Sequence, residues 1–205
     1  MNVAIFASGG GSNFQALLDR VSSGDLHCNL ALCVGNNSKA FAFERARKNS
    51  IPVCHIAPSH FATIDLYEKA LLAVLEKNGI ELIVLAGYMK QIPASLIRAY
   101  PHRIVNIHPG LLPAFGGKGL YGANVHQAVL DYGAKVSGIT IHYVDEEYDH
   151  GPIIFQACAP VLDADDAHSL GARVLLLEHA NYWKVIEAIV NGRITVRGTR
   201  AYGDV

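Results

Sequence analysis

The feature that most constrains the fold is an alternation between short apolar runs and longer polar or amphipathic segments. The apolar runs are NVAIFA, CNLALCVG, PVCHI, ELIVLAG and RIVNIH. Continuous apolar runs are typical of strands that are covered on both faces. Strands that alternate with helices form parallel sheets through βαβ units. The sequence therefore predicts an α/β fold, with a Rossmann-like, mostly parallel sheet and helices on both faces.

Helical periodicity supports this architecture. It is clearest over residues 63–78, where Ile64, Tyr67, Leu71, Val74 and Leu75 share one face. A shorter helix is expected over residues 123–132, and a longer one from Asp165-Asp166 to Asn191-Gly192. Between these two helices, VSGITIHYVD and GPIIFQACAPV predict a hairpin, so the sheet should be mixed. With no linker or repeat, the 205 residues predict a single domain over 1–205.

Composition excludes several classes of function. The formal net charge is −1, so no global basic field favours nucleic acid. The apolar runs are too short and interrupted to span a bilayer, and the N-terminus lacks the pattern of a signal sequence. The four cysteines form no C-x-x-C pair, which favours reduced thiols over a zinc site. We expect a cytoplasmic protein that binds neither nucleic acid nor membranes.

The stretch IFASGGGSNFQALL passes from a predicted strand to a predicted helix through a glycine-rich turn. Glycines permit a close backbone approach, and the following helix offers N–H groups that suit a phosphate. The turn lacks both the G-x-G-x-x-G spacing and the Walker lysine, which disfavours dinucleotides and nucleoside triphosphates. A single phosphomonoester on Gly11, Ser12 and Asn13 fits the pattern. The ordinary alternative is a tight turn capped by Ser12.

A second candidate site lies in RIVNIHPG. Asn106 and His108 occupy positions i and i+2 of a predicted strand, so their side chains share one face. Pro109 ends the strand, and ligands of open α/β sheets bind beyond the carboxyl ends of strands. A carboxamide beside an imidazole could stabilise an oxyanion. The ordinary alternative is a buried His108 bonded to a loop carbonyl, with Asn106 capping the turn.

An imidazole in this role needs a carboxylate, and the loop DEEYDHGPII offers several. Asp149 is the best placed, because it precedes the turn into the next strand. Residues 145–147 have the character of a solvated charge run. We expect Asp149 to raise the pKa of His108, since a neighbouring negative charge favours the imidazolium. His142 is expected either to pack in the core or to support the site from behind, and not to act as a catalyst.

Together, SGGGSN, LAGYMK, VNIHPGLLP and DHGPII, in this order and spacing, resemble the phosphoribosylglycinamide formyltransferases. These are folate-dependent enzymes of purine biosynthesis in the formyltransferase superfamily. The resemblance extends from Met1 to about Arg200. It implies that residues 1–205 form a formyltransferase domain that transfers the formyl group of 10-formyltetrahydrofolate to the glycine amine of 5-phosphoribosylglycinamide.

The resemblance also implies roles for residues. Asn106 and His108 would stabilise the tetrahedral oxyanion, and Asp149 would hold His108 and assist proton transfer. The ribonucleotide would be bound by Gly11, Ser12, Asn13 and Glu178. The folate would lie against Met89, Lys90, Gln91, Ile92 and Asn106. 10-Formyltetrahydrofolate is a co-substrate and no metal is required. The partners would be small molecules only, and the protein a monomer or homodimer.

Three alternatives remain. A formyltetrahydrofolate hydrolase would use the same Asn, His and Asp with water, and would be expected to carry a regulatory domain before the first strand at Asn2. A methionyl-tRNA formyltransferase would be expected to carry a C-terminal RNA-binding domain and a basic surface. A non-enzymatic nucleotide-binding module could share the βαβ core, and would keep its role after mutation of His108. The sequence favours none of these over formyl transfer to the ribonucleotide.

Overall fold

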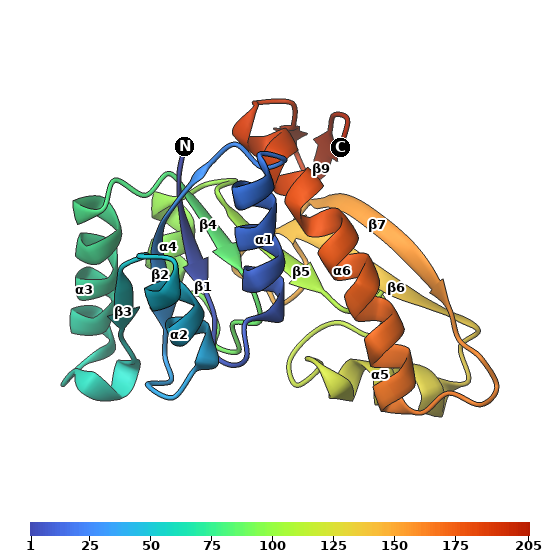
Figure 1. Ribbon diagram of the computed structural model, residues 1–205. Coiled ribbons are helices and arrows are strands. Elements are labelled where there is room, and N and C mark those ends of the chain that lie inside the picture. Colours follow the sequence, from blue (N-terminus) through green and yellow to red (C-terminus); the bar gives the residue numbers. More distant parts are fainter. The chain divides into compact units, whose positions relative to one another are not determined.

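Seven strands form the main sheet in the order β3-β2-β1-β4-β5-β6-β7, and β8 pairs with β9 in a separate hairpin. The computed structural model describes residues 1–205. The strands are β1 (Asn2–Phe6), β2 (Asn29–Gly35), β3 (Val53–His55), β4 (Leu82–Leu85), β5 (Ile104–His108), β6 (Val136–Tyr143), β7 (Ile153–Pro160), β8 (Thr195–Arg197) and β9 (Arg200–Tyr202). The helices are α1 (Ser12–Ser23), α2 (Phe41–Lys48), η1 (Pro58–His60), α3 (Ile64–Lys77), α4 (Ala94–Ala99), α5 (Ala123–Tyr132) and α6 (Ala167–Val190). Figure 1 shows these elements along the chain, and the predicted α/β fold with a mixed, mostly parallel sheet is confirmed.

The chain divides into two compact units, residues 1–105 and residues 106–205. The boundary lies within β5, where the sequence shows no linker. The expectation of one domain over residues 1–205 stays a prediction.

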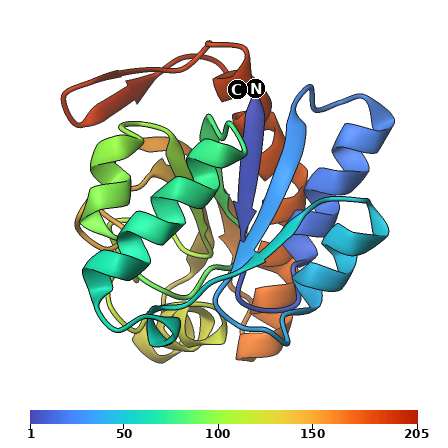
Figure 2. The same cartoon turned by 90° about the vertical axis from the view of Figure 1, so that its left-hand side faces the viewer.

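The first unit is a parallel sheet covered by helices. Strand β1 pairs in parallel with β2 and β4, and β2 pairs in parallel with β3. Every residue of β4 is buried, as is all of β1 after Asn2, which explains their continuous apolar sequences. Figure 2 shows α1 and α2, in blue and cyan, on one face of these strands, and α3 and α4, in green, on the other.

Helix α3 shows how closely the predicted pattern matches the structure. Thr63 caps the helix, its side-chain oxygen accepting a hydrogen bond from Leu66 N at 3.3 Å. The buried side chains are Tyr67, Leu71 and Leu75. The prediction that Ile64 belongs to the apolar stripe was wrong, because its side chain at the first helical position is 58% exposed.

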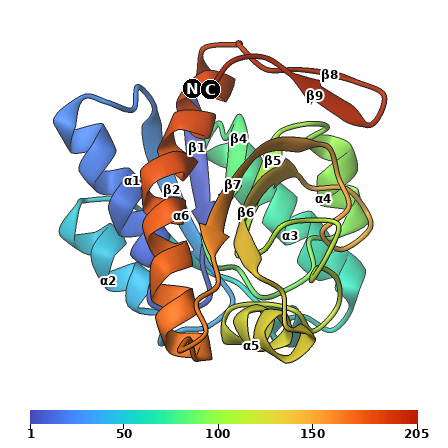
Figure 3. The same ribbon diagram turned by 90° about the vertical axis from the view of Figure 1, so that its right-hand side faces the viewer.

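The second unit is built around the antiparallel pair β6 and β7. Helix α6 packs against both strands and α5 packs against α6, as Figure 3 shows. Helix α6 begins with a capping box, in which Asp166 accepts from Ser169 N and the Ser169 hydroxyl accepts from Asp166 N. The predicted helix over 123–132, the hairpin and the long C-terminal helix are all confirmed.

The loop after β5 is fixed by a buried side chain of β6. The Thr140 hydroxyl donates to Gly110 O at 2.7 Å and accepts from Leu112 N at 3.0 Å. The side chain of Gln156 on β7 donates to Leu112 O at 2.9 Å and to Thr140 Oγ1 at 2.9 Å. These bonds satisfy the backbone that leaves the strand at Pro109, and they fix the direction in which the chain departs from His108.

Candidate active site

In the first unit, the glycine-rich turn leaves the start of α1 open to a ligand. Gly11 precedes the helix in a left-handed conformation, with φ 68° and ψ 38°, and no side chain caps the first turn. Helix N-termini present unpaired N–H groups that bind anions. Ser12 is the first helical residue and not the cap, so the alternative of a turn capped by Ser12 does not hold.

Gly11 is also required by close packing against α2. A Cβ at this position would lie 2.9 Å from Ala42 Cβ and 3.1 Å from Ala42 Cα. The first of these distances is shorter than side-chain carbons tolerate, and a positive φ is unfavourable for any residue with a Cβ. Glycine therefore lets the turn approach α2 closely enough for a side chain of α2 to reach it.

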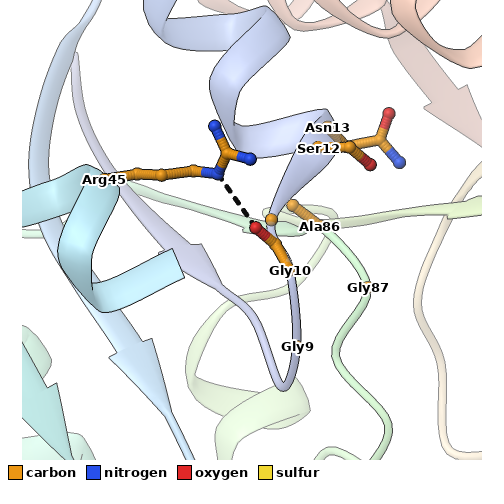
Figure 4. Close-up of a pocket in the computed structure, with 8 residues that line it drawn as sticks. Gly9, Gly10, Ser12, Asn13, Arg45, Ala86 and Gly87 are labelled. Carbon is orange, nitrogen blue, oxygen red and sulfur yellow. Dashed lines mark hydrogen bonds between the residues drawn. The ribbon is translucent and has the colours of Figure 1, made fainter. Parts of the chain in front are cut away.

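That side chain is Arg45. A cavity of about 270 Å³ is lined by Gly9, Gly10, Gly11, Ser12, Asn13, Arg45, Ala86 and Gly87. Arg45 Nε donates to Gly10 O at 2.9 Å, as Figure 4 shows, and Arg45 Nη1 donates to Gln15 Oε1 at 2.7 Å. The sequence did not single out Arg45, because an arginine within ERARK is typical of any exposed helix face. Only the folded chain places this cation beside the turn.

Ser8 joins the glycine-rich turn to the segment after β4. Its hydroxyl donates to Asn36 Oδ1 at 2.6 Å and accepts from Met89 N at 2.9 Å. Its backbone N–H donates to Gly87 O at 3.1 Å. The side chain is buried, so these bonds are shielded from competing water. Ser8 thus sets the position of Met89 relative to the turn.

The segment 89–92 combines exposed and buried positions. Met89, Lys90 and Gln91 are exposed, whereas Ile92 is 5% exposed and belongs to the core. Met89 is 54% exposed, so its apolar side chain is available to a ligand. Three of the four predicted folate residues in this segment are therefore accessible to a ligand, whereas Ile92 is not.

In the second unit, Asn106 and His108 project from the carboxyl end of β5. Asn106 is half-buried, and His108 is 3% exposed. The His108 Nε2 atom lies 2.9 Å from Phe115 O. Because a carbonyl only accepts, the proton of this bond is on Nε2. This bond to a loop carbonyl is the one that the ordinary alternative predicted for His108. It uses Nε2 only, so Nδ1 remains available for another partner.

His108 Nδ1 faces Asp149. The distance from Nδ1 to Asp149 Oδ2 is 3.6 Å, although the two residues are 41 positions apart. Asp149 Oδ2 also accepts from Gly117 N at 2.9 Å. Asp145 is occupied elsewhere, with its carboxylate 2.8 Å from Nδ1 of the exposed His150. The structure thus brings together Asn106, His108 and Asp149, and the choice of Asp149 over residues 145–147 agrees with this placement.

The expected direction of the His108 pKa was wrong. Burial lowers the pKa of His108 below its ordinary value, and the charge of Asp149 and the bond to Phe115 O oppose this shift without reversing it. The reason is that an imidazolium loses more hydration at this buried position than one carboxylate 3.6 Å away restores. At neutral pH the ring is neutral, with a proton on Nε2 and a lone pair on Nδ1.

His142, expected either to pack or to support the site from behind, contacts two members of this group. It lies on β6 and is 2% exposed. His142 Nδ1 is 2.8 Å from Tyr143 O, so Nδ1 carries the proton of a neutral ring. Nε2 then accepts from Asn106 Nδ2 at 3.2 Å, and it lies 3.8 Å from Asp149 Oδ1. The alternation in GITIHY could have indicated that His142 and Thr140 share one face of their strand. It could not indicate that His142 would contact Asn106 on the neighbouring strand.

Glu178 is a buried carboxylate on α6, 8% exposed. Burial raises the pKa of the neighbouring Tyr182 well above its usual value, and the charge of Glu178 adds to this shift. Glu178 belongs to the second unit, whereas Gly11, Ser12 and Asn13 belong to the first. Their predicted shared role in binding one ligand therefore stays a prediction.

Two further features bear on the kind of site. No group of three or more His, Cys, Asp and Glu side chains is arranged to hold a metal ion. No helix combines the length and apolar character that crossing a bilayer requires.

Comparison with known proteins defines the class. The sequence family described as Formyl transferase matches residues 1–186, so the chain belongs to the formyl transferase family. It is 46% identical to the chloroplastic phosphoribosylglycinamide formyltransferase of Arabidopsis thaliana, over 95% of this chain and 67% of that protein. It is 38% identical to the phosphoribosylglycinamide formyltransferase of Bacillus subtilis, over 97% of this chain and 98% of that protein.

A solved structure agrees with these relatives. Glycinamide ribonucleotide transformylase 1 of Symbiobacterium toebii superposes with a TM-score of 0.93 at 35% identity, covering 99% of this chain and 93% of that one. The chain is therefore a formyltransferase with the fold of the glycinamide ribonucleotide enzymes. Formyl transfer in this family uses 10-formyltetrahydrofolate as co-substrate.

Proposed function

We propose that this formyltransferase transfers the formyl group of 10-formyltetrahydrofolate to the glycine amine of 5-phosphoribosylglycinamide, a step of de novo purine biosynthesis. The observation that carries the proposal is the grouping of Asn106, His108 and Asp149 at the end of β5. The His108 imidazole lies 3.6 Å from the Asp149 carboxylate, and the Asn106 amide projects from the same end of β5, an arrangement that suits acyl transfer through a tetrahedral oxyanion.

The ribonucleotide is bound through its phosphate at the glycine-rich turn. Gly11, Ser12 and Asn13 offer the open N-terminus of α1, and Arg45 adds a positive charge to the same cavity. Two of the Arg45 nitrogens are already used by Gly10 and Gln15, so the guanidinium is held in place and keeps Nη2 for the ligand. Glu178 contacts the ribonucleotide, a role that rests on the resemblance to the family.

The folate lies against residues 89–92 and Asn106. The exposed Met89 side chain offers an apolar surface to the pterin, and Ser8 fixes the Met89 backbone. The loop 145–149 covers the bound folate, a role that also rests on the resemblance.

The chemistry follows from the donors on β5. The amine attacks the formyl carbon, a new C–N bond forms, and the carbonyl oxygen becomes an oxyanion. Asn106 donates a hydrogen bond to this oxyanion. His108 Nε2–H, which donates to Phe115 O in the structure, donates to the oxyanion instead. A single well-placed donor of this kind contributes about 3 to 4 kcal/mol to the transition state.

Collapse of the intermediate requires a proton transfer. The amine nitrogen loses a proton, and N10 of the folate gains one as its bond to the formyl carbon breaks. At neutral pH His108 Nδ1 is unprotonated, and Asp149 is near enough to stabilise a proton there. The pair can therefore accept the proton of the amine and deliver it to the leaving nitrogen.

The decisive experiment follows folate product in the purified protein supplied with 10-formyltetrahydrofolate, with and without the ribonucleotide. We expect turnover only when both substrates are present. Equal turnover without the ribonucleotide would identify a formyltetrahydrofolate hydrolase instead. If the folded protein turns over neither mixture, the non-enzymatic nucleotide-binding module becomes the better interpretation.

We further propose that the protein acts in the cytoplasm, as a monomer or homodimer whose partners are its small-molecule substrates. Fractionation of the native cells and light scattering of the purified protein test these two points. Plastid fractionation is the informative comparison, because the Arabidopsis thaliana relative is described as chloroplastic.

A further inference from the structure

His142 contacts both Asn106 and Asp149, yet the chemistry described above gives it no task. It is buried on β6, and its two ring nitrogens are used differently. Nδ1 donates to Tyr143 O at 2.8 Å. Because that bond fixes the proton on Nδ1, Nε2 of the neutral ring can only accept.

This acceptor determines which way the Asn106 carboxamide faces. Asn106 approaches His142 Nε2 at 3.2 Å, and only its NH₂ group can donate to that nitrogen. With one N–H bound to His142, the second N–H of the same amide is left to donate elsewhere. A flipped amide would place Oδ1 against the His142 lone pair, so two acceptors would meet.

We infer that His142 is a positioning residue. Its neutral ring holds the Asn106 carboxamide in the orientation that leaves one N–H to donate to the oxyanion. Protonation of the ring reverses this orientation, so the oxyanion loses the Asn106 donor. This inference rests on the proposed function of Asn106. An imidazolium has N–H groups on both nitrogens, so it would present a donor to the Asn106 NH₂ group. The amide would then turn its oxygen to His142, and it would lose its donor orientation.

Protonation would also change the carboxylate. A proton on His142 Nε2 would attract Asp149 Oδ1, which is already 3.8 Å away. Asp149 would then be shared between His142 and His108. The titratable groups that face His142 are His108 on β5, and Asp145 and Asp149 in the loop between β6 and β7. Burial lowers the pKa of His142, the charges of Asp149 and Asp145 oppose this shift, and a charged His108 reinforces it.

Two substitutions separate positioning from structural support. In His142→Gln the side-chain oxygen can accept from Asn106, but it does not titrate. In His142→Phe the acceptor is lost at every pH. We expect His142→Gln to keep kcat within a few-fold at neutral pH and to lose the fall in kcat on the acidic side. We expect His142→Phe to lower kcat by roughly 10- to 100-fold with little change in KM, since one oriented donor is lost at the transition state.

The double variant Asn106→Ala/His142→Phe gives a third comparison. If His142 acts only through Asn106, kcat of the double variant should equal that of Asn106→Ala alone. Independent, additive losses would contradict the inference. An acidic limb shared by the wild type and His142→Gln would also overturn it, because another group would then titrate.

A second measurement does not depend on activity. In NMR spectra of the wild type, the Asn106 side-chain amide signals should shift with the same midpoint as the His142 ring signals. If His142→Phe does not fold, this titration and His142→Gln still decide the question. If the Asn106 amide signals do not shift while His142 titrates, the positioning role is overturned. A wild type that shows this coupling but no formyl transfer would refute only the proposed function.

Discussion

At the scale of single residues, Arg45 supplies the positive charge of the glycine-rich turn. We predict that Arg45→Gln weakens ribonucleotide binding by roughly 10- to 100-fold, because a hydrogen bond to a charged group contributes about 1.5 to 3 kcal/mol. Calorimetric titration with the ribonucleotide measures this, and folate binding should stay nearly unchanged.

The matched control is Arg47→Gln, on the same helix. The Arg47 guanidinium lies over the Phe43 ring at 5.9 Å and does not line the cavity. Its replacement should leave ribonucleotide binding unaffected. Equal weakening by both substitutions would show that net charge, and not a contact of Arg45, governs the affinity.

The predictability of the site differs from residue to residue. The shared face of Asn106 and His108 followed from strand periodicity, and Asp149 followed from its place before a turn. Arg45 was missed, and the contact of His142 with Asn106 was not predicted, because these contacts depend on the approach of α2 to Gly11 and on the pairing of neighbouring strands. The sign of the His108 pKa shift was missed because burial is a property of the folded chain and not of the local sequence.

At the scale of elements, Ser8 links the end of β1 to the segment after β4. We predict that Ser8→Ala raises KM for the folate several-fold while changing ribonucleotide binding less. The substitution leaves Met89 N and Asn36 Oδ1 without the Ser8 hydroxyl as hydrogen-bond partner, and a buried unsatisfied group costs about 1 to 3 kcal/mol. Steady-state kinetics with each substrate varied in turn measure the two effects.

A buried serine in the second unit provides the control. Ser137 is 2% exposed, and its hydroxyl has no hydrogen-bond partner. Ser137→Ala should therefore leave both KM values unchanged and should not lower the stability. If Ser8→Ala affects folate binding no more than Ser137→Ala does, the bond from Met89 to Ser8 does not position the segment.

Elements were predicted with more success than the faces they present. The order of strands and helices followed from apolar runs, capping residues and glycine stops, which act locally. Ile64 shows the limit of this reasoning. Periodicity placed it on the apolar stripe of α3, but it is the first residue of the helix and its side chain is exposed.

At the scale of the whole molecule, the division into two units was not predictable. The boundary at residues 105 and 106 falls inside β5, a mostly buried strand with no linker-like sequence. Linkers are recognised from polar or flexible sequence, and a strand that belongs to both units offers no such pattern.

Acid sensitivity is a second property of the whole molecule, and it arises from its buried histidines. Burial is the main cause that lowers the pKa of each of His108, His126 and His142. The unfolded chain takes up these protons at the ordinary histidine pKa, near 6.5, whereas the folded chain takes them up only at lower pH. The stability that these histidines contribute as buried neutral rings is therefore complete above about pH 6.5. It is lost as the pH falls through the lower pKa values of the folded chain.

We predict that the midpoint of urea unfolding is steady from pH 8 to 7 and falls progressively between pH 6.5 and 5. His126 is the best residue for testing the cause, because its Nδ1 is buried without a partner and it has no role in the proposed chemistry. The variant His126→Gln should lose less stability across this range than the wild type. The exposed His168 provides the control, and His168→Gln should follow the wild-type curve. Three parallel curves would show that carboxylates, and not buried histidines, set the acid limit of the fold.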